Sequence, residues 1–350
     1  EAVPESDRAI EIQHLELPMG QEVVERTLGI EWSISNDAFQ FKVVLKQRPP
    51  TRRGILSAVS SVYDPLGFLS PVILKGRIIL QQICKVGLDW DDPLPDAILE
   101  RWESWKKDLV EVENFKVSRC YKPANFNDLT TVELHHFSDA STVGYGQCSY
   151  LRLIDSENNV RCTLVMSKAR VAPVKQVTVP RLELSAASLA VKVSNFLRKE
   201  LRYDNVQEYF WTDSTVVLGY INTDAKRFHV FVANRVQQIR NSTEPEQWNH
   251  VNSENNPADY ASRGMTAQHL IQNEVWLNGP QFLRSSTLPQ PSQSPEVPDS
   301  DPELKQVRSF ATTQASDDMQ RHWSRFSSWQ RLRKAVAHCL RYKRILQQRV

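Results

Sequence analysis

The repeat of hydrophobic and polar positions changes several times along this chain, and each repeat predicts a different kind of element. Up to about Leu45, the stretch LGIEWSISNDAFQFKVVL alternates, which predicts a β-hairpin turning at residues 35–37. Over residues 51–112, apolar residues recur at helical spacing. This predicts a first helix near residue 55, a second over 73–86 and a third over 98–109.

Between about Asp128 and Gly264 the pattern alternates between strands and helices. The predicted strands cover residues 132–139, 144–153, 160–170, 208–212 and 246–251, and the predicted helices cover 180–201, a stretch from about 214, 227–240 and a stretch from near 257. Three strands followed by helix-strand-helix-strand-helix predict an α/β domain, with a mixed five-stranded sheet flanked by helices.

The last part of the chain changes composition again. Residues 279–304 carry six prolines among many Ser and Gln, which predicts a disordered linker. From Met319 to Val350 there are nine Lys and Arg residues and no acid, in a pattern that predicts basic amphipathic helices. By charge alone these helices fit a solvated or partner-binding face as well as a nucleic-acid contact.

Composition sets outer limits on the class of protein. The chain has 350 residues, 41% of them hydrophobic and 24% charged, as expected of a soluble protein with two or three domains. Its formal net charge of +2 does not by itself indicate nucleic-acid binding. Five scattered cysteines without a CxxC pair argue against a disulfide scaffold or a cysteine zinc site, and favour reduced thiols in an intracellular protein.

Two further sequence features bear on context. No run of eighteen apolar residues is present, so we expect no membrane span. The chain opens with EAVPESDR, without an initiator Met or a signal peptide, and we expect it to be part of a longer polypeptide.

Four acidic residues stand where predicted elements begin or end. Asp139 and Asp213 each close a β-like run, Glu183 lies in the first turn of a helix-like run, and Asp259 follows Pro257 at a helix start. If the two strands are neighbours, the carboxylates of Asp139 and Asp213 meet at one end of the sheet. Small residues after Glu183 would let its helix lie close enough to bring this side chain over the strand ends.

Carboxylates crowded together repel one another and lose hydration, so a site that gathers them usually needs a cation. Oxygen ligands suit Mg²⁺ or Mn²⁺, and two such ions about 3.5–4 Å apart are a recurring device for cutting phosphodiesters. Either Glu183 or Asp259 alone could instead be a first-turn acid that complements a helix dipole. The four acids together, in this order, predict a metal site.

Several longer motifs make the chain resemble the polyproteins of Pao/BEL-type long-terminal-repeat retrotransposons, and its central part resembles the ribonuclease H (RNase H) fold. The motifs that carry the resemblance are FSDAS (137–141), VPRLELSAA (179–187), WTDSTVVLGYI (211–221), RFHVFVANRV (227–236) and WNHVNSENNPADYASRG (248–264). Upstream, RRGILSAVSSVYDPLGFLSPV resembles the segment after the polymerase palm of these elements, and downstream RFSSWQRLRKAVAHCLRYKR resembles the start of their integrase.

The resemblance implies cleavage of the RNA strand of RNA–DNA hybrids with two Mg²⁺ or Mn²⁺ ions during reverse transcription. It implies that Asp139, Glu183, Asp213 and Asp259 are metal ligands and catalytic residues. Many ribonucleases H carry a mobile histidine near the last acid that helps product leave, which makes His250 a further catalytic candidate. Alternatively, His250 is a strand-end residue that hydrogen-bonds to the backbone.

Basic residues near these motifs fit a hybrid substrate, because phosphate contacts supply affinity and contacts to 2′-hydroxyls mark the RNA strand. The alternative is a solvated surface. The nucleic-acid-binding candidates are Lys168, Arg170, Lys175, Arg181, Arg227 and Arg235.

The same resemblance predicts the division of the chain and its context. The predicted parts are a β-hairpin-like end of reverse transcriptase (1–50), a separate helical thumb- or connection-like region (51–127), an RNase H-like domain (128–278), a linker (279–316) and the basic start of an integrase region (317–350). The expected partners are an RNA–DNA hybrid and the palm and integrase of the same polyprotein, with no membrane. The expected location is intracellular, in a cytoplasmic virus-like particle with access to the nucleus.

Some signatures expected of a whole polyprotein are missing. The paired aspartates that a polymerase carries on a strand–turn–strand are absent, because Asp91-Asp92 lies in a polar loop. The Cys- and His-rich zinc module of an integrase is absent as well. An aspartic peptidase, a label that family catalogues attach to this region, requires an Asp-Thr/Ser-Gly turn. Neither Asp213-Ser214-Thr215 nor Asp139-Ala140-Ser141 has that glycine. A non-catalytic connection or scaffold segment remains as an alternative to the nuclease.

Overall fold

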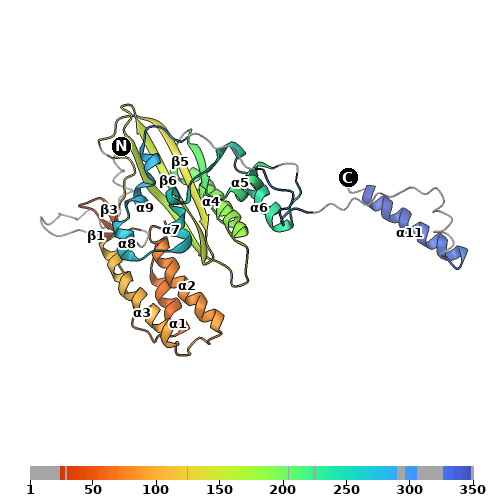
Figure 1. The fold of residues 1–350 in the computed structure, drawn as a ribbon, viewed down its shortest axis with the longest axis horizontal. Coiled ribbons are helices and arrows are strands. Elements are labelled where there is room, and N and C mark those ends of the chain that lie inside the picture. Colours follow the sequence, from red (N-terminus) through yellow and green to blue (C-terminus); the bar gives the residue numbers. More distant parts are fainter. Residues whose placement is uncertain are drawn as a thin grey trace, which may run out of the picture. The chain divides into compact units, whose positions relative to one another are not determined.

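The computed structural model describes residues 24–27, 30–123, 125–203, 205–223, 226–289, 296–305 and 326–347. The chain divides into two compact units, residues 1–305 and 306–350. Figure 1 shows the elements of both. No helix in the described ranges is long and apolar enough to span a membrane.

A mixed five-stranded sheet forms the centre of the first unit, as predicted. Its strands lie in the order β7-β6-β5-β8-β9. The first three strands are antiparallel, and β8 and β9 continue the sheet parallel to β5. Their bounds are β5 (Leu129–Ala140), β6 (Gly144–Asp155), β7 (Val160–Val171), β8 (Gln207–Thr212) and β9 (Trp248–His250).

One face of the sheet is covered by three helices: α4 (Val179–Leu201), α5 (Thr215–Asn222) and α6 (Val230–Arg240). Leu184 and Val191 of α4 pack there with Phe210 of β8 and Trp248 of β9 in one buried cluster. These helices lie where the 3.6-residue spacing predicts them, because each has an apolar stripe that the sheet can bury.

The opposite face carries two groups of helices that share one core with the sheet (Figure 1). The first group is α1 (Arg52–Ser61), α2 (Ser70–Val86) and α3 (Asp96–Val110), which agrees with the predicted helical region. The second group is α7 (Ala258–Arg263), α8 (Ala267–Gln272) and α9 (Glu274–Asn278). Trp105 of α3, Phe137 of β5 and Trp276 of α9 belong to the same buried cluster.

This shared core departs from the separate helical unit expected for residues 51–127. Leu66 accepts a backbone hydrogen bond from Ser167 on the edge strand β7, and the hydroxyls of Ser70 and Ser167 lie 2.6 Å apart. Gly67 has a φ of +81°, and a Cβ there would lie 1.8 Å from the Ser167 carbonyl oxygen. The helices therefore cap the exposed edge of the sheet, and the proposed boundary near residue 128 runs through one compact unit.

A small second sheet contains the hairpin predicted near the start of the chain. It orders the antiparallel strands β1 (Val24–Thr27), β2 (Ile30–Ser33), β3 (Ala38–Gln40) and β4 (Lys116–Ser118). The turn at residues 35–37 lies as expected between β2 and β3. The pairing of β3 with β4 was not predicted, because a three-residue strand carries too little periodicity to detect.

The prediction of a disordered linker is wrong for the described residues of 279–305. A 3₁₀ helix, η6 (Gln281–Arg284), packs with Leu283 fully buried. Residues 296–305, here called the strap, bury Val297 and Glu303, and Leu304 forms a β-bridge with Phe228. Proline-rich composition signals the absence of regular elements, but it does not exclude packing in an extended conformation.

A buried ionic network joins η6 to the sheet. Arg152 on β6, only 1% exposed, donates to the Glu133 carboxylate at 2.6 Å and to the carbonyls of Leu283 and Ser285 at 2.8 and 2.6 Å. Burial raises the pKa of Glu133, but hydrogen bonds from His135 and Arg152 and the positive charge of Arg152 outweigh this and leave it below its usual range. The network thus binds a stretch predicted to be disordered to the centre of the sheet.

His135 in this network is held in its neutral form. Trp211 Nε1 donates to His135 Nδ1 at 3.1 Å, and His135 Nε2 lies 3.0 Å from Glu133 Oε2, to which it donates. Burial lowers the pKa of His135 from 6.5 to about 4, although Glu133 partly opposes the shift. Between these two values the unfolded chain takes up a proton that the folded protein does not, so this residue's contribution to stability falls as the pH decreases.

We expect His135→Gln, which keeps one donor and one acceptor, to remove this pH-dependent contribution. The wild type should lose about 2 kcal/mol more unfolding free energy than the variant between pH 7 and pH 5. Urea unfolding of both proteins at the two pH values measures this difference. Equal losses would show that His135 takes up its proton in the folded state.

The second unit contains one described helix, α11 (Trp329–Gln347), which is basic and amphipathic as expected. It has no buried residue, and most of its large apolar side chains, including Trp329 and Leu340, are exposed. The remaining residues of the predicted basic region, among them Arg321, Arg325 and Arg349, lie outside the described residues.

Candidate active site

Two of the four predicted acids lie side by side at the same end of the sheet. Ser138 of β5 is in register with Thr212 of β8, so Asp139 and Asp213 are the next residues along two adjacent parallel strands. Adjacent strands are separated by only about 4.8 Å. Both acids follow the aromatic residues of the α7-facing side, Phe137 and Trp211, at two-residue spacing, so they face the same side of the sheet.

Glu183 lies one turn into α4 and reaches the same end of the sheet. The three alanines on its helix face, Ala186, Ala187 and Ala190, are completely buried, which lets the helix approach the strands closely as expected. Ser214, the residue after Asp213, donates its hydroxyl to Glu183 Oε2. The same hydroxyl accepts from the backbone N–H of Val217 and caps α5, so one serine links Glu183 to the end of β8.

The last acid enters from α7, on the opposite face. Asp259 is the second residue of this helix and is paired with the Arg263 guanidinium one turn later. Ser262, between them, donates its hydroxyl to the Asp139 carboxylate. Gly146 of β6 permits this contact, because a Cβ there would lie 2.7 Å from Ala261. The acid site is therefore built from both faces of the sheet.

Electrostatics show that the acids act on one another. The pKa of Asp139 is raised to about 6, mainly by burial and also by the charges of Asp213 and Asp259, while the hydrogen bond from Ser262 opposes the shift. Burial also raises the pKa of Glu183, with a further contribution from Asp213 and an opposing hydrogen bond from Ser214. A carboxylate held this way is stabilised by a nearby cation.

The four acids have the chemistry of divalent-metal ligands, but they do not form a complete metal-binding group. All four side chains offer oxygen ligands, which suit Mg²⁺ or Mn²⁺. In the described part of the chain, however, no three His, Cys, Asp or Glu side chains form a group that could hold one metal ion. Each acid instead contacts a polar partner of the chain, and Asp213 accepts from Ser253 at 2.6 Å and from Asn256 at 3.4 Å.

His250 ends β9, the strand next to β8. It is in register with Thr212, so it lies beside the strand end that leads into Asp213. Its side chain is half-buried. His250 therefore lies at the end of the sheet that carries the acids. Its role in helping product leave stays a prediction.

Four of the predicted nucleic-acid-binding residues are exposed: Lys168, Arg170, Lys175 and Arg227. Lys168 and Arg170 lie on β7 near the end of the sheet that carries Asp139, since Asp139 is in register with Gly146 and Gly146 with Ala169. Their role in binding stays a prediction.

The other two basic candidates have internal partners that sequence reasoning did not foresee. Arg181 donates to both carboxylate oxygens of Glu303 in the strap, at 2.6 and 2.9 Å. Arg235 lies over the Phe231 ring, 3.5 Å from its centroid, and donates to Ser185. Nucleic-acid binding by Arg181 would require breaking a two-point ion pair, so the structure favours a structural role for both residues.

The polar partners of the acids were missed at the sequence level: Ser214, Ser253, Asn256, Ser262 and Arg263. A signal existed for Ser214, because serine directly before an apolar helical run is a typical N-cap. Arg263 stands four residues after Asp259, a spacing that allows an ion pair on one helix turn. The contacts of Ser253, Asn256 and Ser262 depend on tertiary packing, and no local pattern predicts them.

The strand order, the helices on both faces and the acids at one end of the central strands define an RNase H-like fold. Residues 51–214 match the family model described as the Pao retrotransposon-like RNaseH-like domain. The chain therefore carries an RNase H-like domain of the Pao retrotransposon type. The matched range begins at α1 and includes Asp139, Glu183 and Asp213, whereas Asp259 and His250 lie beyond it.

Comparison with solved structures gives remote similarities to ribonucleases H. The N-terminal RNase H domain of a Mycobacterium tuberculosis protein, solved as a fusion with maltose-binding protein, is 12% identical, with 38% of this chain and 91% of that chain covered and a TM-score of 0.27. RNase H1 of the archaeon Halobacterium salinarum is 13% identical, with 38% and 94% covered and a TM-score of 0.26.

A third solved structure, the foamy viral protease-reverse transcriptase in complex with double-stranded DNA, is 9% identical. The match covers 65% of this chain and 38% of the viral chain, with a TM-score of 0.23. No curated protein matches the chain.

Proposed function

We propose that this chain is a metal-dependent ribonuclease H-type endonuclease that cuts the RNA strand of RNA–DNA hybrids during reverse transcription. The observation that carries the proposal is the placement of Asp139 and Asp213 on adjacent parallel strands, with Glu183 and Asp259 brought to them from opposite faces. Crowding four carboxylates costs stability through repulsion, whereas two-metal phosphodiester cleavage uses such a group.

In the proposed mechanism, Asp139, Glu183, Asp213 and Asp259 would hold two Mg²⁺ or Mn²⁺ ions. When bound, these ions would supply an activated water and neutralise charge that develops on the phosphate. The chain's own residues orient the carboxylates: Ser262 holds Asp139, and Ser214 holds Glu183. Asn256 donates to the Ser138 carbonyl at 3.2 Å as well as to Asp213, so it links the ends of β5 and β8.

The site also contains its own counterion. Arg263 is exposed and paired with Asp259, which offsets one negative charge of the group before any cation binds. For Asp259 to ligate a metal, this pair has to loosen. We therefore assign Asp259 the mobile position of the four, and Asp139, which is 6% exposed, the fixed one.

The test is cleavage of a hybrid whose RNA strand carries a 5′ label, with purified protein and Mg²⁺. We expect cuts in the RNA strand of the hybrid, none in its DNA strand or in an RNA duplex of the same sequence, and none with EDTA. Repeating the assay with Mn²⁺ covers the other cation.

A second candidate function, a non-catalytic scaffold for nucleic acid or neighbouring domains, is favoured by one observation. The described residues contain no ready metal group, and each acid already has a polar partner. Binding of the hybrid without cleavage in either metal would establish the scaffold and reject the nuclease.

The proposed context is a polyprotein whose polymerase palm and integrase lie in other segments, assembled in a cytoplasmic virus-like particle with access to the nucleus. The sequence motifs upstream and downstream of the domain support it. In this arrangement the palm synthesises the DNA strand, and the present domain removes the RNA template from the resulting hybrid.

A further inference from the structure

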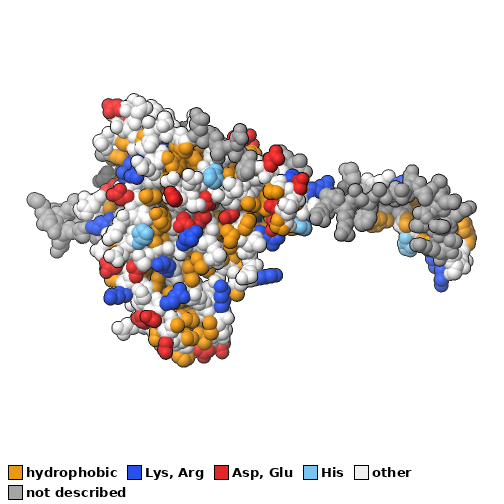
Figure 2. Space-filling model, viewed as in Figure 1, with side chains coloured by type: hydrophobic (Ala, Val, Ile, Leu, Met, Phe, Trp, Pro, Cys, Tyr) orange, Lys and Arg blue, Asp and Glu red, His pale blue; other side chains and the backbone are white. Residues whose placement is uncertain are grey.

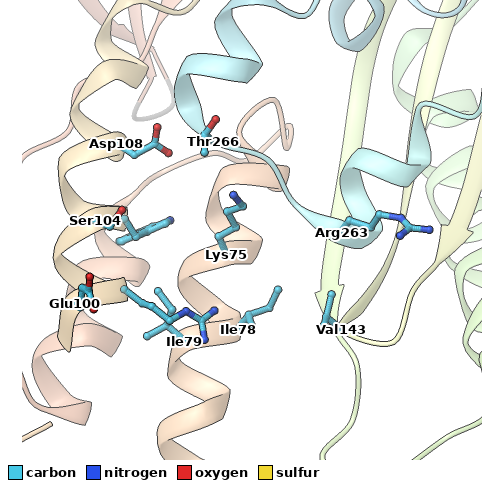
Figure 3. Close-up of a pocket in the computed structure, with 11 residues that line it drawn as sticks. Lys75, Ile78, Ile79, Glu100, Ser104, Asp108, Val143, Arg263 and Thr266 are labelled. Atoms are coloured by element: carbon cyan, nitrogen blue, oxygen red, sulfur yellow. The ribbon is translucent and has the colours of Figure 1, made fainter. Parts of the chain in front are cut away.

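A cavity of about 610 Å³ lies between the helical region and the RNase H-like part of the first unit. Figure 3 shows Lys75 and Ile78 on α2, Glu100 and Asp108 on α3, and Arg263 with Thr266 on the α7–α8 segment around it. Val143, in the turn that follows β5, closes one side. Neither the proposed catalytic acids nor the predicted basic residues line this cavity.

Close backbone packing fixes the cavity wall. Gly264 has a φ of +77°, and a Cβ there would lie 2.9 Å from the Pro71 carbonyl oxygen and 3.0 Å from Lys75 Cγ. The Met265 N–H donates to the same Pro71 carbonyl. The α7–α8 segment is therefore fastened to the start of α2, and Lys75 projects beside it.

The charges that line the cavity favour an anion. Two carboxylates and three cations line it, but Arg263 is paired with Asp259, so Lys75 and Arg101 are the cations that remain. The Asp108 carboxylate already accepts hydrogen bonds from the backbone N–H groups of Ala267 and Gln268 at the start of α8.

The cations Lys75 and Arg101 keep their charge available. Arg101 donates at 2.5 Å to Gln82, a neutral partner. Lys75 has no ion pair among the described residues, and Figure 3 shows its amino group directed toward the space between Asp108 and Thr266. Both therefore remain free to pair with a ligand anion.

The cavity adjoins the acid site through shared residues. Arg263 lines the cavity and pairs with Asp259 at the acid site. In Figure 3 its guanidinium points away from Lys75. Ser141, in the same turn as Val143, donates to the Ser262 carbonyl at 2.8 Å, which ties the turn to α7. Figure 2 shows acidic side chains gathered near the middle of one face, and Lys and Arg side chains below them over α2 and α3.

We propose that this cavity binds the phosphodiester backbone of the nucleic acid beyond the bond that is cut, with Lys75 and Arg101 contacting phosphate. Ile78, Ile79 and Trp105 form an apolar wall, which suits the sugar of a nucleotide chain better than a free inorganic anion. The inference rests on the proposed function, and it assigns the helices α2 and α3 a direct part in holding substrate.

The test measures binding, by fluorescence anisotropy of a labelled hybrid with EDTA present so that no strand is cut. The variant is the full chain with Lys75→Gln and Arg101→Gln. We expect about tenfold weaker binding, and a plot of log affinity against log salt that is shallower by about 2, one for each lost phosphate contact. Phosphate contacts carry no sequence information, so a DNA duplex should lose affinity to a similar extent.

The matched control replaces the exposed Lys85 and Lys107 of the same two helices with Gln, outside the cavity. It removes the same charge and should retain affinity and salt dependence. A second variant, Ser104→Glu, leaves both cations in place and adds a carboxylate to the wall. It should weaken binding as well, which guards against a folding defect in the double variant.

The outcomes separate this inference from the proposed function. If the wild type binds and cuts the hybrid but the cavity variants bind as tightly as the control, the cavity inference is wrong and the nuclease stands. If the control loses affinity as much as the double variant, the effect is general charge and the cavity is again rejected. If the wild type binds no hybrid, both proposals fail together.

Discussion

Asp213→Asn is expected to reduce hybrid cleavage by at least about 100-fold, equivalent to about 2.7 kcal/mol of transition-state stabilisation, while the fold is retained. An amide keeps the size of the side chain and can keep the contact with Ser253, but it supplies no charge to offset a cation. Because it also relieves repulsion of Asp139 and Glu183, whose pKa values Asp213 raises, stability should hold or rise slightly.

The measurement is single-turnover cleavage of the labelled hybrid under saturating Mg²⁺, together with thermal unfolding and hybrid binding. Asp128→Asn is the matched control: it makes the same chemical change in an exposed carboxylate just before the first residue of β5, the strand that ends near Asp139. Activity of Asp213→Asn within tenfold of the parent would show that Asp213 is not a metal ligand.

Arg152→Met is expected to destabilise the first unit by about 3–5 kcal/mol, because it leaves Glu133 buried without its permanently charged partner. It also removes the anchors of the Leu283 and Ser285 carbonyls. The loss should be greatest at neutral pH. Without Arg152 the pKa of Glu133 rises, so the variant regains stability as the pH falls and Glu133 becomes protonated.

Chemical denaturation at two pH values measures this loss. The double variant Arg152→Met with Glu133→Gln should recover part of it, since no buried charge then remains unpaired. Lys192→Met, the same kind of change at an exposed position of α4, should stay within about 0.5 kcal/mol of the parent. If Arg152→Met lowers the unfolding free energy no more than Lys192→Met does, then Arg152 does not stabilise the fold.

The sequence predicted the central sheet well for a physical reason. Strands β5 to β7 carry long runs that bury on both faces, and the turns between them are short, so the limits of the strands are sharp. The candidate acids could be identified because strand ends and helix starts are visible as changes of period. Adjacent parallel strands then bring Asp139 and Asp213 together without further information.

What could not be predicted depends on contacts between distant segments. The strap has no periodicity in its sequence. Its acids are held by contacts with Arg181, Tyr220 and Lys226, which lie on other elements. The packing of α1–α3 against the sheet likewise depends on the contact between Ser70 and Ser167, which are far apart in the sequence. The sequence does not show whether the counterion of a basic residue lies within the same chain, so the pairing of Arg181 with Glu303 could not be foreseen.

The strap also limits where the polypeptide can be divided. A chain that ended at residue 278 would leave Arg181 without Glu303, Tyr220 without Asp301 and Lys226 without Asp299. It would also uncover the apolar residues packed beneath Val297. A proteolytic cut that leaves this domain stably folded is therefore expected to fall after Lys305, and a cut that removes the strap is expected to destabilise it.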